Sequence, residues 1–321
     1  MQRLIERAKE LLNGGEVKRV LGWKKGDMGY NHEPYFFNSA EELQDFIYDG
    51  FSGANLSKFM IEASKLEGKT LVFLKPCDTY SFNQLLKENR VKREAAYIIG
   101  VGCKGKLDIE KIKAKGIKGI LEIEGAEEFS ENETLKVKTL YGEDEVSYKE
   151  ALLGRCHMCK GKEHRIYDEV IGDSIDTADE ERFSEVEKIE AMTPEERFSF
   201  FKAELSKCIR CNACRNVCPA CSCRKCVFDS AKFDSEQKAN SDSFEEKMFH
   251  IIRAFHVAGR CTDCGECSRV CPEGIPLYLF NKKFIKDIDT YFGKYNAGEN
   301  IEDEAPLTSF TFDDLEPDER R

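Results

Sequence analysis

Hydrophobic and polar positions alternate with two different periods in the first half of the chain. Residues 1–12 (MQRLIERAKELL) place apolar side chains at the spacing of an amphipathic helix. Short apolar runs and segments of helical spacing follow in turn: strands are predicted at 68–74, 95–100 and 119–123, and helices at 80–92 and 109–115. This alternation predicts an α/β domain over residues 1–160, with a mostly parallel sheet and flanking helices.

Polar stretches divide the second half of the chain. Residues 161–192 are polar and acidic apart from the apolar run at 167–171, and we expect a linker there. Residues 296–321 are predicted to be an acidic tail, which is either solvated or a docking peptide. The docking alternative depends on three apolar side chains among the acids: Phe310, Phe312 and Leu315.

Two capped helices are predicted between these polar stretches. Thr193 and Glu196 have the spacing of a capping box, with Pro194 at the first helical position. Ser243 and Glu246 repeat the signature. The stripes expected to face the core are Phe198, Phe201 and Leu205 in the first helix, and Phe244, Met248, Ile251, Ile252 and Phe255 in the second, where His250 and His256 are also expected to pack.

Composition and charge narrow the class of protein. The chain has 321 residues, 41% of them hydrophobic, which is enough for two packed units and excludes wholesale disorder. With 49 basic and 60 acidic residues, its net charge of −11 argues against nucleic acid or an anionic membrane as a partner. No apolar run is long enough to span a membrane, and the N-terminus lacks a signal-peptide pattern. We therefore expect a soluble, cytoplasmic protein.

Eight of the 15 cysteines form two runs of identical spacing, each ending in proline: Cys208, Cys211, Cys214 and Cys218, and Cys261, Cys264, Cys267 and Cys271. In this spacing three thiolates hold three corners of a 4Fe–4S cluster, and the fourth cysteine reaches the other cluster. The predicted ligand sets are Cys208, Cys211, Cys214 with Cys271, and Cys261, Cys264, Cys267 with Cys218. A zinc site would use paired CxxC or Cys/His sets instead. Residues 193–295 are thus predicted to be a mainly helical, dicluster ferredoxin-type domain that carries electrons.

Four further cysteines are candidates for a third cluster. Cys77 and Cys103 each follow a predicted strand, where α/β sheets gather ligands. Cys156 and Cys159 form a CxxC, which alone is also compatible with zinc or thiol redox chemistry. Together the four thiols would suffice for a third 4Fe–4S cluster.

The last three cysteines directly follow the first run. Cys221, Cys223 and Cys226 fall within six residues. They would form a further cluster with a non-cysteine or borrowed ligand, share ligation with Cys156 and Cys159, or stay free thiols. The sequence leaves these alternatives open.

One glycine-rich turn resembles a dinucleotide fingerprint. Residues 100–105 (GVGCKG) spell GxGxxG after a predicted strand. The helix that follows is short and interrupted at Gly116, and Cys103 lies inside the turn. A flavin-binding or cluster-binding turn is therefore favoured over a Rossmann fold.

Three residues are candidates for binding an anionic cofactor, and Lys104 is a further source of positive charge. Asn55 and Lys58 lie in a small-residue loop that enters a helix, which suits a phosphate group or simply caps the helix. Lys75 lies beside Cys77, and Lys104 beside Cys103. Both lysines would place positive charge near a flavin or a cluster.

These motifs resemble the beta subunits of deazaflavin-reducing hydrogenase and of formate dehydrogenase. The resemblance rests on 75–77 (KPC), 99–103 (IGVGC) and 155–159 (RCHMC) and covers residues 50–275. It implies a 4Fe–4S cluster on Cys77, Cys103, Cys156 and Cys159 beside FAD, but it assigns no flavin contact to an individual residue of this chain. The two-cluster module here is C-terminal, and the helices before its motifs resemble heterodisulfide-reductase-type and sulfite-reductase-type ferredoxin modules.

The resemblance implies an electron-transfer subunit of an anaerobic oxidoreductase complex. Its partners would be other subunits of that complex, such as a formate dehydrogenase, hydrogenase or heterodisulfide-reductase-like catalytic subunit. Two alternatives stay open: a flavin-dependent reductase that acts on its own substrate, and a flavin-free wiring or docking subunit.

Overall fold

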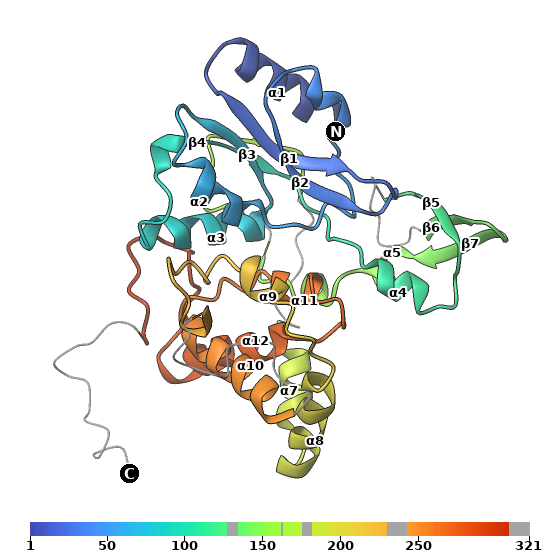
Figure 1. Ribbon diagram of the computed structural model, residues 1–321, viewed down its shortest axis with the longest axis vertical. Coiled ribbons are helices and arrows are strands. Elements are labelled where there is room, and N and C mark those ends of the chain that lie inside the picture. The colour runs from blue at the N-terminus through green and yellow to red at the C-terminus, as the bar shows by residue number, and fades with distance from the viewer. Residues whose placement is uncertain (127–133, 162, 175–181, 230–242, 308–321) are drawn as a thin grey trace.

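The computed structural model describes residues 1–126, 134–161, 163–174, 182–229 and 243–307. The N-terminal part forms an α/β unit, and the helices α7 to α12 form a second unit beneath it in the view of Figure 1. The arrangement confirms the predicted α/β fold with a mainly helical C-terminal part.

A five-stranded sheet forms the centre of the α/β unit. Its strands lie in the order β2-β1-β3-β4-β8, and only the β1–β2 pair is antiparallel. The bounds are β1 (Arg19–Lys25), β2 (His32–Phe37), β3 (Thr70–Leu74), β4 (Ala96–Val101) and β8 (Glu169–Ile171). β3 and β4 confirm the strands predicted at 68–74 and 95–100. Every residue of β3 is buried, as expected for a central parallel strand.

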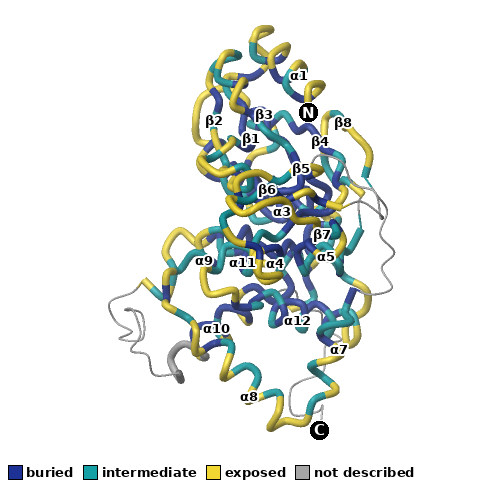
Figure 2. The backbone as a smooth tube through the Cα atoms, turned by 90° about the vertical axis from the view of Figure 1, so that its right-hand side faces the viewer, coloured by how far each residue is buried: buried dark blue, intermediate teal, exposed yellow. Residues whose placement is uncertain are grey.

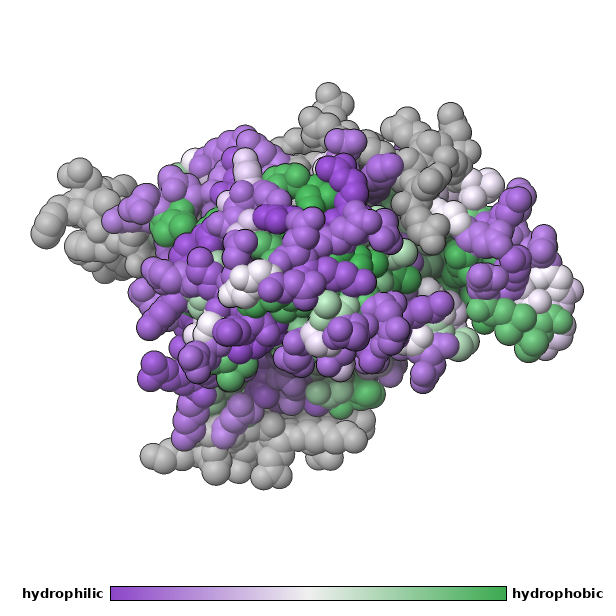
Figure 3. Space-filling view, turned by 90° about the horizontal axis from the view of Figure 1, so that it is seen from above, coloured by the Kyte–Doolittle hydropathy of each residue, from purple (hydrophilic) through white to green (hydrophobic). Residues whose placement is uncertain are grey.

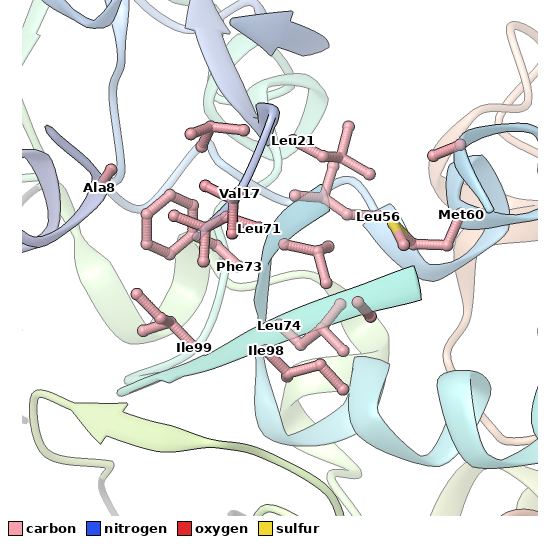
Figure 4. Close-up of a cluster of buried hydrophobic side chains, with 14 of the residues drawn as sticks. Ala8, Val17, Leu21, Leu56, Met60, Leu71, Phe73, Leu74, Ile98 and Ile99 are labelled. Carbon is pink, nitrogen blue, oxygen red and sulfur yellow. The ribbon is translucent and has the colours of Figure 1, made fainter. Parts of the chain in front are cut away.

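Helices cover the sheet and close its core. The longer helices are α1 (Gln2–Asn13) and α3 (Pro76–Lys87), and the shorter one is α2 (Met60–Ala63), which follows a 3₁₀ turn. α1 confirms the predicted amphipathic helix, and α3 begins four residues before its predicted start because Pro76 suits the first helical position. Figure 4 shows Leu71, Phe73 and Ile98 of the strands packed with Leu56 and Met60.

The strand predicted at 119–123 exists but belongs to a different sheet. β5 (Ile120–Glu124), β6 (Thr134–Thr139) and β7 (Gly142–Ser147) form a separate antiparallel sheet in the order β5-β6-β7. Its placement in the parallel sheet was wrong, because β5 pairs with β6 rather than with β4. The short helices α4 (Ile109–Lys113), α5 (Tyr148–Ala151) and α6 (Gly154–His157) connect this sheet to the rest.

The expected linker at 161–192 contributes to both units. Its apolar run contains β8, which pairs with the edge of β4, and Arg93 on the preceding turn bonds to Asp168 at 2.6 Å. Farther along, α7 (Ser184–Glu190) packs against the last helix through Glu190 and Lys286 at 2.5 Å. The mostly polar connection therefore adds an edge strand to the α/β unit and a helix to the helical unit.

The helical unit contains α8 (Pro194–Leu205), α9 (Ala213–Asn216), α10 (Ser243–Val257), α11 (Glu266–Arg269) and α12 (Tyr278–Tyr291). The capping box of α8 is confirmed: Glu196 N donates to Thr193 Oγ1 at 3.3 Å, and Thr193 N donates to Glu196 Oε2 at 2.9 Å. Figure 2 shows α8 largely exposed. Phe201 packs on Phe280, but Phe198 is 62% exposed and does not face the core.

α10 buries a different face from the one predicted. Met248, Ile251 and Phe255 are exposed, whereas Phe249 and Arg253 are buried. The prediction was wrong because the cysteine loops pack against the other side of α10 and leave its apolar stripe exposed. The expected cap at Ser243 and Glu246, and Phe244 with it, fall outside the described side chains.

The first part of the expected acidic tail folds back onto the α/β unit. Ala297 and Ala305 are buried, and Glu299 pairs with Arg165 at 2.8 Å. Gly298, at a φ of +74°, lies so close to α3 that an added Cβ would stand 1.9 Å from Tyr80 O. The residues behind the docking alternative (Phe310, Phe312 and Leu315) lie outside the described residues.

The described helices include none with the length and apolar character needed to cross a bilayer. The face of the molecule seen in Figure 3 is mainly hydrophilic, with apolar groups scattered over it.

Candidate metal centres

The sequence repeat is also a repeat in backbone geometry. In the first cysteine loop Arg210 and Asn212 have φ values of 54° and 60°, and in the second loop Asp263 and Gly265 occupy the same positions at 56° and 63°. Each loop then enters a four-residue helix, α9 or α11. The left-handed residues turn the chain so that successive cysteines face one centre.

The four cysteines of the first predicted set line one cavity of about 330 Å³. The first run contributes Cys208, Cys211 and Cys214, and the fourth cysteine, Cys271, comes from the second run. Hydrophobic packing places Cys208 and Cys271 against the cluster that contains Cys214, and Cys267 of the second run belongs to the same cluster.

The other three cysteines of the second predicted set all lie within electrostatic reach of Cys218. Cys218 packs with Val257, and Cys261 lies against the same small cluster. Cys264 and Cys267 are buried. Each fourth cysteine thus lies with the opposite run, which is the crossed arrangement that the spacing predicts.

The buried face of α10 presents two polar side chains to these loops. His250 Nε2 lies 3.2 Å from Cys208 Sγ, and Arg253 Nη2 donates to Cys214 O at 3.0 Å. Burial lowers the pKa of His250 to about 3, so its imidazole is neutral at pH 7. Sequence reasoning assigned His250 to helix packing and missed Arg253. The available signal was their three-residue spacing on one side of the helix.

The third predicted set lies at the carboxyl edge of the parallel sheet. Cys77 follows β3 at the start of α3, and Cys103 follows β4. Because these parallel strands are neighbours, their carboxyl ends lie side by side. Cys156 on α6 accepts a hydrogen bond from Lys106 N at 3.3 Å, and Cys159 follows three residues later.

Buried cations surround this third group. Lys106 Nζ donates to Asp49 O at 2.6 Å, and Lys160 Nζ donates to Thr262 O. Neither lysine forms an ion pair with a carboxylate in the part of the chain that the structure describes. Burial lowers the pKa of each lysine to about 8. Since burying an unpaired charge is costly, these cations fit an anionic group such as a thiolate-bound iron–sulfur cluster.

Arg155 connects the third group to the second cysteine loop. Its Nη1 donates to Cys264 O and to Glu266 Oε1, and its Nη2 donates to Gly53 O at 2.8 Å. Arg155 also lies within electrostatic reach of Cys77 and Cys156. The two groups of cysteines are therefore adjacent in space, although they are more than a hundred residues apart in sequence.

Two of the three residues expected near a flavin are engaged inside the protein. Asn55 Nδ2 donates to Ser81 Oγ at 2.9 Å, and its Oδ1 accepts from Ser57 N as a cap. Lys75 forms a buried ion pair with Asp78 at 2.6 Å. These contacts occupy polar atoms of both side chains within the α/β unit. Lys58 donates a hydrogen bond to Cys221 O at 2.5 Å. Its side chain therefore lies beside the loop that follows the first cysteine run.

Another cavity is better placed for a flavin. It measures about 1100 Å³, including its open mouth, and lies at the carboxyl ends of β4 and β8. Its lining includes Gly102, Lys104, Gly105 and Lys106, which flank Cys103, together with Tyr48. A second large cavity, of about 1470 Å³, opens between the two units and is lined by Lys111, Arg155 and Cys271 among others.

The remaining cysteines also lie together. Cys221, Cys223 and Cys226 line a cavity of about 960 Å³, including open solvent, against the end of α10. Within the described ranges, no three Cys, His, Asp or Glu side chains converge tightly enough to hold a single metal ion.

Comparisons with known proteins agree with this geometry. Residues 204–275 match the model of a 4Fe–4S dicluster domain. The chain is 24% identical to the F420-dependent formate dehydrogenase subunit beta of Methanocaldococcus jannaschii, with 88% of each chain covered. It is 26% identical to the F420-dependent formate dehydrogenase 1 subunit beta of Methanococcus maripaludis, covering 93% of this chain and 90% of that one.

The family resemblance is confirmed. The chain is similar to formate dehydrogenase beta subunits over about nine-tenths of its length, and its C-terminal part matches a 4Fe–4S dicluster domain. The matched domain contains all eight cysteines of the two runs. These findings support an iron–sulfur electron-transfer subunit. A chain of the F420-reducing [NiFe] hydrogenase complex from Methanosarcina barkeri also matches, with 16% identity, a TM-score of 0.38 and coverage of 49% of this chain and 58% of that one.

Proposed function

We propose that this protein relays electrons between a catalytic subunit of formate dehydrogenase or hydrogenase type and an acceptor, through three 4Fe–4S clusters and FAD. Its relatives are named as beta subunits of formate dehydrogenases, which supports a place in such a complex. Residues 1–160 would form the flavin and iron–sulfur domain, 161–192 the connection, 193–295 the dicluster domain and 296–321 the tail.

The ligand sets of the dicluster domain follow the crossed pattern. Cys208, Cys211, Cys214 and Cys271 would bind one cluster, and Cys261, Cys264, Cys267 and Cys218 the other. The shared cavity of the first set and the packing of Cys218 with Cys261 support this assignment. The left-handed residues in both loops support it as well, because they give the two runs the same local shape.

The observation that carries the proposal is the link through Arg155. This side chain binds the loop that holds Cys264 and lies within reach of Cys77 and Cys156. A third cluster on Cys77, Cys103, Cys156 and Cys159 would therefore stand next to the second ferredoxin-type cluster. The buried Lys106 and Lys160 would compensate its negative charge.

We assign the flavin to the cavity at the ends of β4 and β8. FAD supplies the conversion between one-electron and two-electron transfer. Lys104 and Lys106 would bind its phosphates or bias its charge, Gly102 and Gly105 let the backbone approach it, and Tyr48 forms one wall. Tyr48 Oη donates to Gly102 O at 2.7 Å and so holds the glycine-rich turn in place.

Cofactor analysis of anaerobically purified protein tests this proposal. At least about twelve irons with matching sulfide and one FAD per chain are expected. About eight irons without flavin would overturn it in favour of a wiring or docking subunit. Turnover of a substrate by the isolated chain, with no catalytic partner, would favour a complete flavin reductase instead.

A further inference from the structure

The cavity behind the first cysteine run has features that the three-cluster relay does not use. It lies between the loop at 218–229 and the C-terminal end of α10. Cys221, Cys223 and Cys226 line it from the loop, and Arg253 and His256 line it from the helix. Cys221 N donates to Cys218 O at 3.1 Å, so the cavity begins directly beside a proposed cluster ligand.

The arrangement of the three thiols is like that of the first cysteine run. In both places cysteines line a cavity wall, and in neither do three side chains of the described residues converge on a point that would suit one ion. A zinc ion would need such convergence at about 2.3 Å from each sulfur. A cubane cluster instead holds its ligands around a larger body. The three thiols and the imidazole of His256 that line this cavity therefore supply the four ligands that a cubane cluster needs.

The charge of the cavity calls for an anionic occupant. Arg253 is only 4% exposed, and its Nε has no hydrogen-bond partner among the described residues. Lys58 reaches the cavity, where it donates to a carbonyl, Cys221 O, and forms no ion pair within the described residues. Arg224 adds a third cation to the lining. Two other lining arginines are already paired, Arg215 with Asp229 and Arg260 with Glu88.

We propose that this cavity holds a fourth 4Fe–4S cluster, bound by the thiolates of Cys221, Cys223 and Cys226. His256, which lines the same cavity, would be the fourth ligand through a ring nitrogen. Each cysteine loses its proton on binding iron, and the positive charges of Arg253, Lys58 and Arg224 offset the resulting negative charge. With this site, all 15 cysteines have a ligand role.

The site also gives the relay an exit at the surface. Cys223 is exposed, whereas Cys218 is buried. A cluster here would take one electron from the neighbouring cluster on Cys218 and pass one electron to a partner at the surface. Arg224, which is exposed beside Cys223, suits a partner with an acidic docking face, such as a small ferredoxin-type electron carrier.

Iron and sulfide analysis of a double variant tests the proposal. The change C223S/C226S is expected to remove about four irons and four sulfides per chain and to weaken the visible charge-transfer absorption. Lys225→Ala, an exposed change in the same loop, is the matched control and should leave both counts unchanged. Retention of the remaining irons, the flavin and the far-ultraviolet circular dichroism would show that the chain still folds.

A second variant tests the fourth ligand. H256Q should convert the cluster to a 3Fe–4S form, with the loss of about one iron and a new EPR signal in the oxidised protein. Unchanged iron and sulfide in C223S/C226S would overturn the proposal. Loss of zinc rather than of iron from that variant would overturn it as well. Because the assay compares variants, its outcome does not depend on whether the third cluster or the flavin is present.

Discussion

Arg155 and Glu266 form an ion pair of 2.6 Å across the junction of the two units, and their side chains are 9% and 0% exposed. Burial would raise the pKa of Glu266, but Arg269 and Arg155 hold it well below its usual range. The carboxylate therefore stays charged, and the pair joins the α/β unit to the loop that contains Cys264.

Removing Arg155 should loosen this junction. Arg155→Gln is expected to destabilise the protein by about 3 kcal/mol, since a buried charge loses one of its two partners. Arg269→Gln removes the other, more exposed partner of the same carboxylate and should cost about 1 kcal/mol. Denaturant unfolding under anaerobic conditions measures both. Equal losses for the two variants would show that the position of Arg155 between the units is unimportant.

Glu88 on α3 should make the second junction contact depend on pH. It accepts hydrogen bonds from Arg260 Nη2 at 2.7 Å and from Ser222 Oγ at 2.6 Å. Burial alone would raise the pKa of Glu88, but these bonds hold it below its usual value. Its stabilising effect is therefore present above the unfolded pKa of about 4.3 and lost as the pH falls through the lower folded value.

Glu88→Gln should thus cost about 1–2 kcal/mol at pH 7 and progressively less below about pH 4.3. Unfolding curves of wild type and variant at several pH values measure this difference. Glu62→Gln, which removes an exposed pair with Lys65, is the control and should change little at any pH. A difference that grows toward low pH would contradict the assignment.

Gly298 should be needed for the C-terminal segment to pack on α3. Alanine there would place its Cβ 1.9 Å from Tyr80 O, at a φ of +74°. Gly293→Ala is a matched control, because Gly293 has a φ of +91° but no atom within 4 Å of the added Cβ. Both variants should lose about 1 kcal/mol from backbone strain. Only Gly298→Ala should also expose residues 296–305 to limited proteolysis.

The crossed ligand assignment predicts which cluster each fourth cysteine serves. Cys271→Ser should perturb the EPR signal of the cluster on Cys208, Cys211 and Cys214, and Cys218→Ser should perturb the other signal. Combining each single change with Cys211→Ser distinguishes the two clusters. Cys271→Ser should add little further damage, because Cys211→Ser has already altered the cluster that both residues bind. If Cys218→Ser were the change that adds little, the assignment would be reversed.

The flavin assignment predicts a difference between two lysines. Lys104→Ala, in the cavity at the ends of β4 and β8, should weaken FAD binding about tenfold, which corresponds to one lost charge-assisted contact. Lys111→Ala, in the cavity between the two units, should leave FAD binding unchanged. Fluorescence titration of the flavin-depleted protein measures both. The reverse result would move the flavin to the second cavity.

Signals that depend on neighbouring residues were readable from the sequence. The capping box of Thr193 and Glu196 needs only a short segment, and its bonds form as predicted. The buried strands at 70–74 and 96–101 also follow from local apolar runs. The cysteine spacing predicted the dicluster domain, because the span of a cluster sets the distance between its ligands along the chain.

Other features depended on contacts between distant segments, and only the tertiary structure decided them. β5 pairs with β6 and not with a strand of the parallel sheet. β8 comes from a mostly polar connection and pairs with β4 at the edge of the parallel sheet. The partners of Asn55 and Lys75 within the α/β unit likewise come from other segments or from the fold of the loop.

The sequence by itself therefore determined the fold class, the capped helices and the two cysteine runs, because the physical causes of these features act over a few residues. The tertiary structure decided which face of α10 is buried, so that Arg253 rather than Phe255 faces the cysteines. It also decided that Arg155 joins the third group of cysteines to the second run. Those outcomes depend on which surfaces exclude water from one another, and a local pattern does not record that.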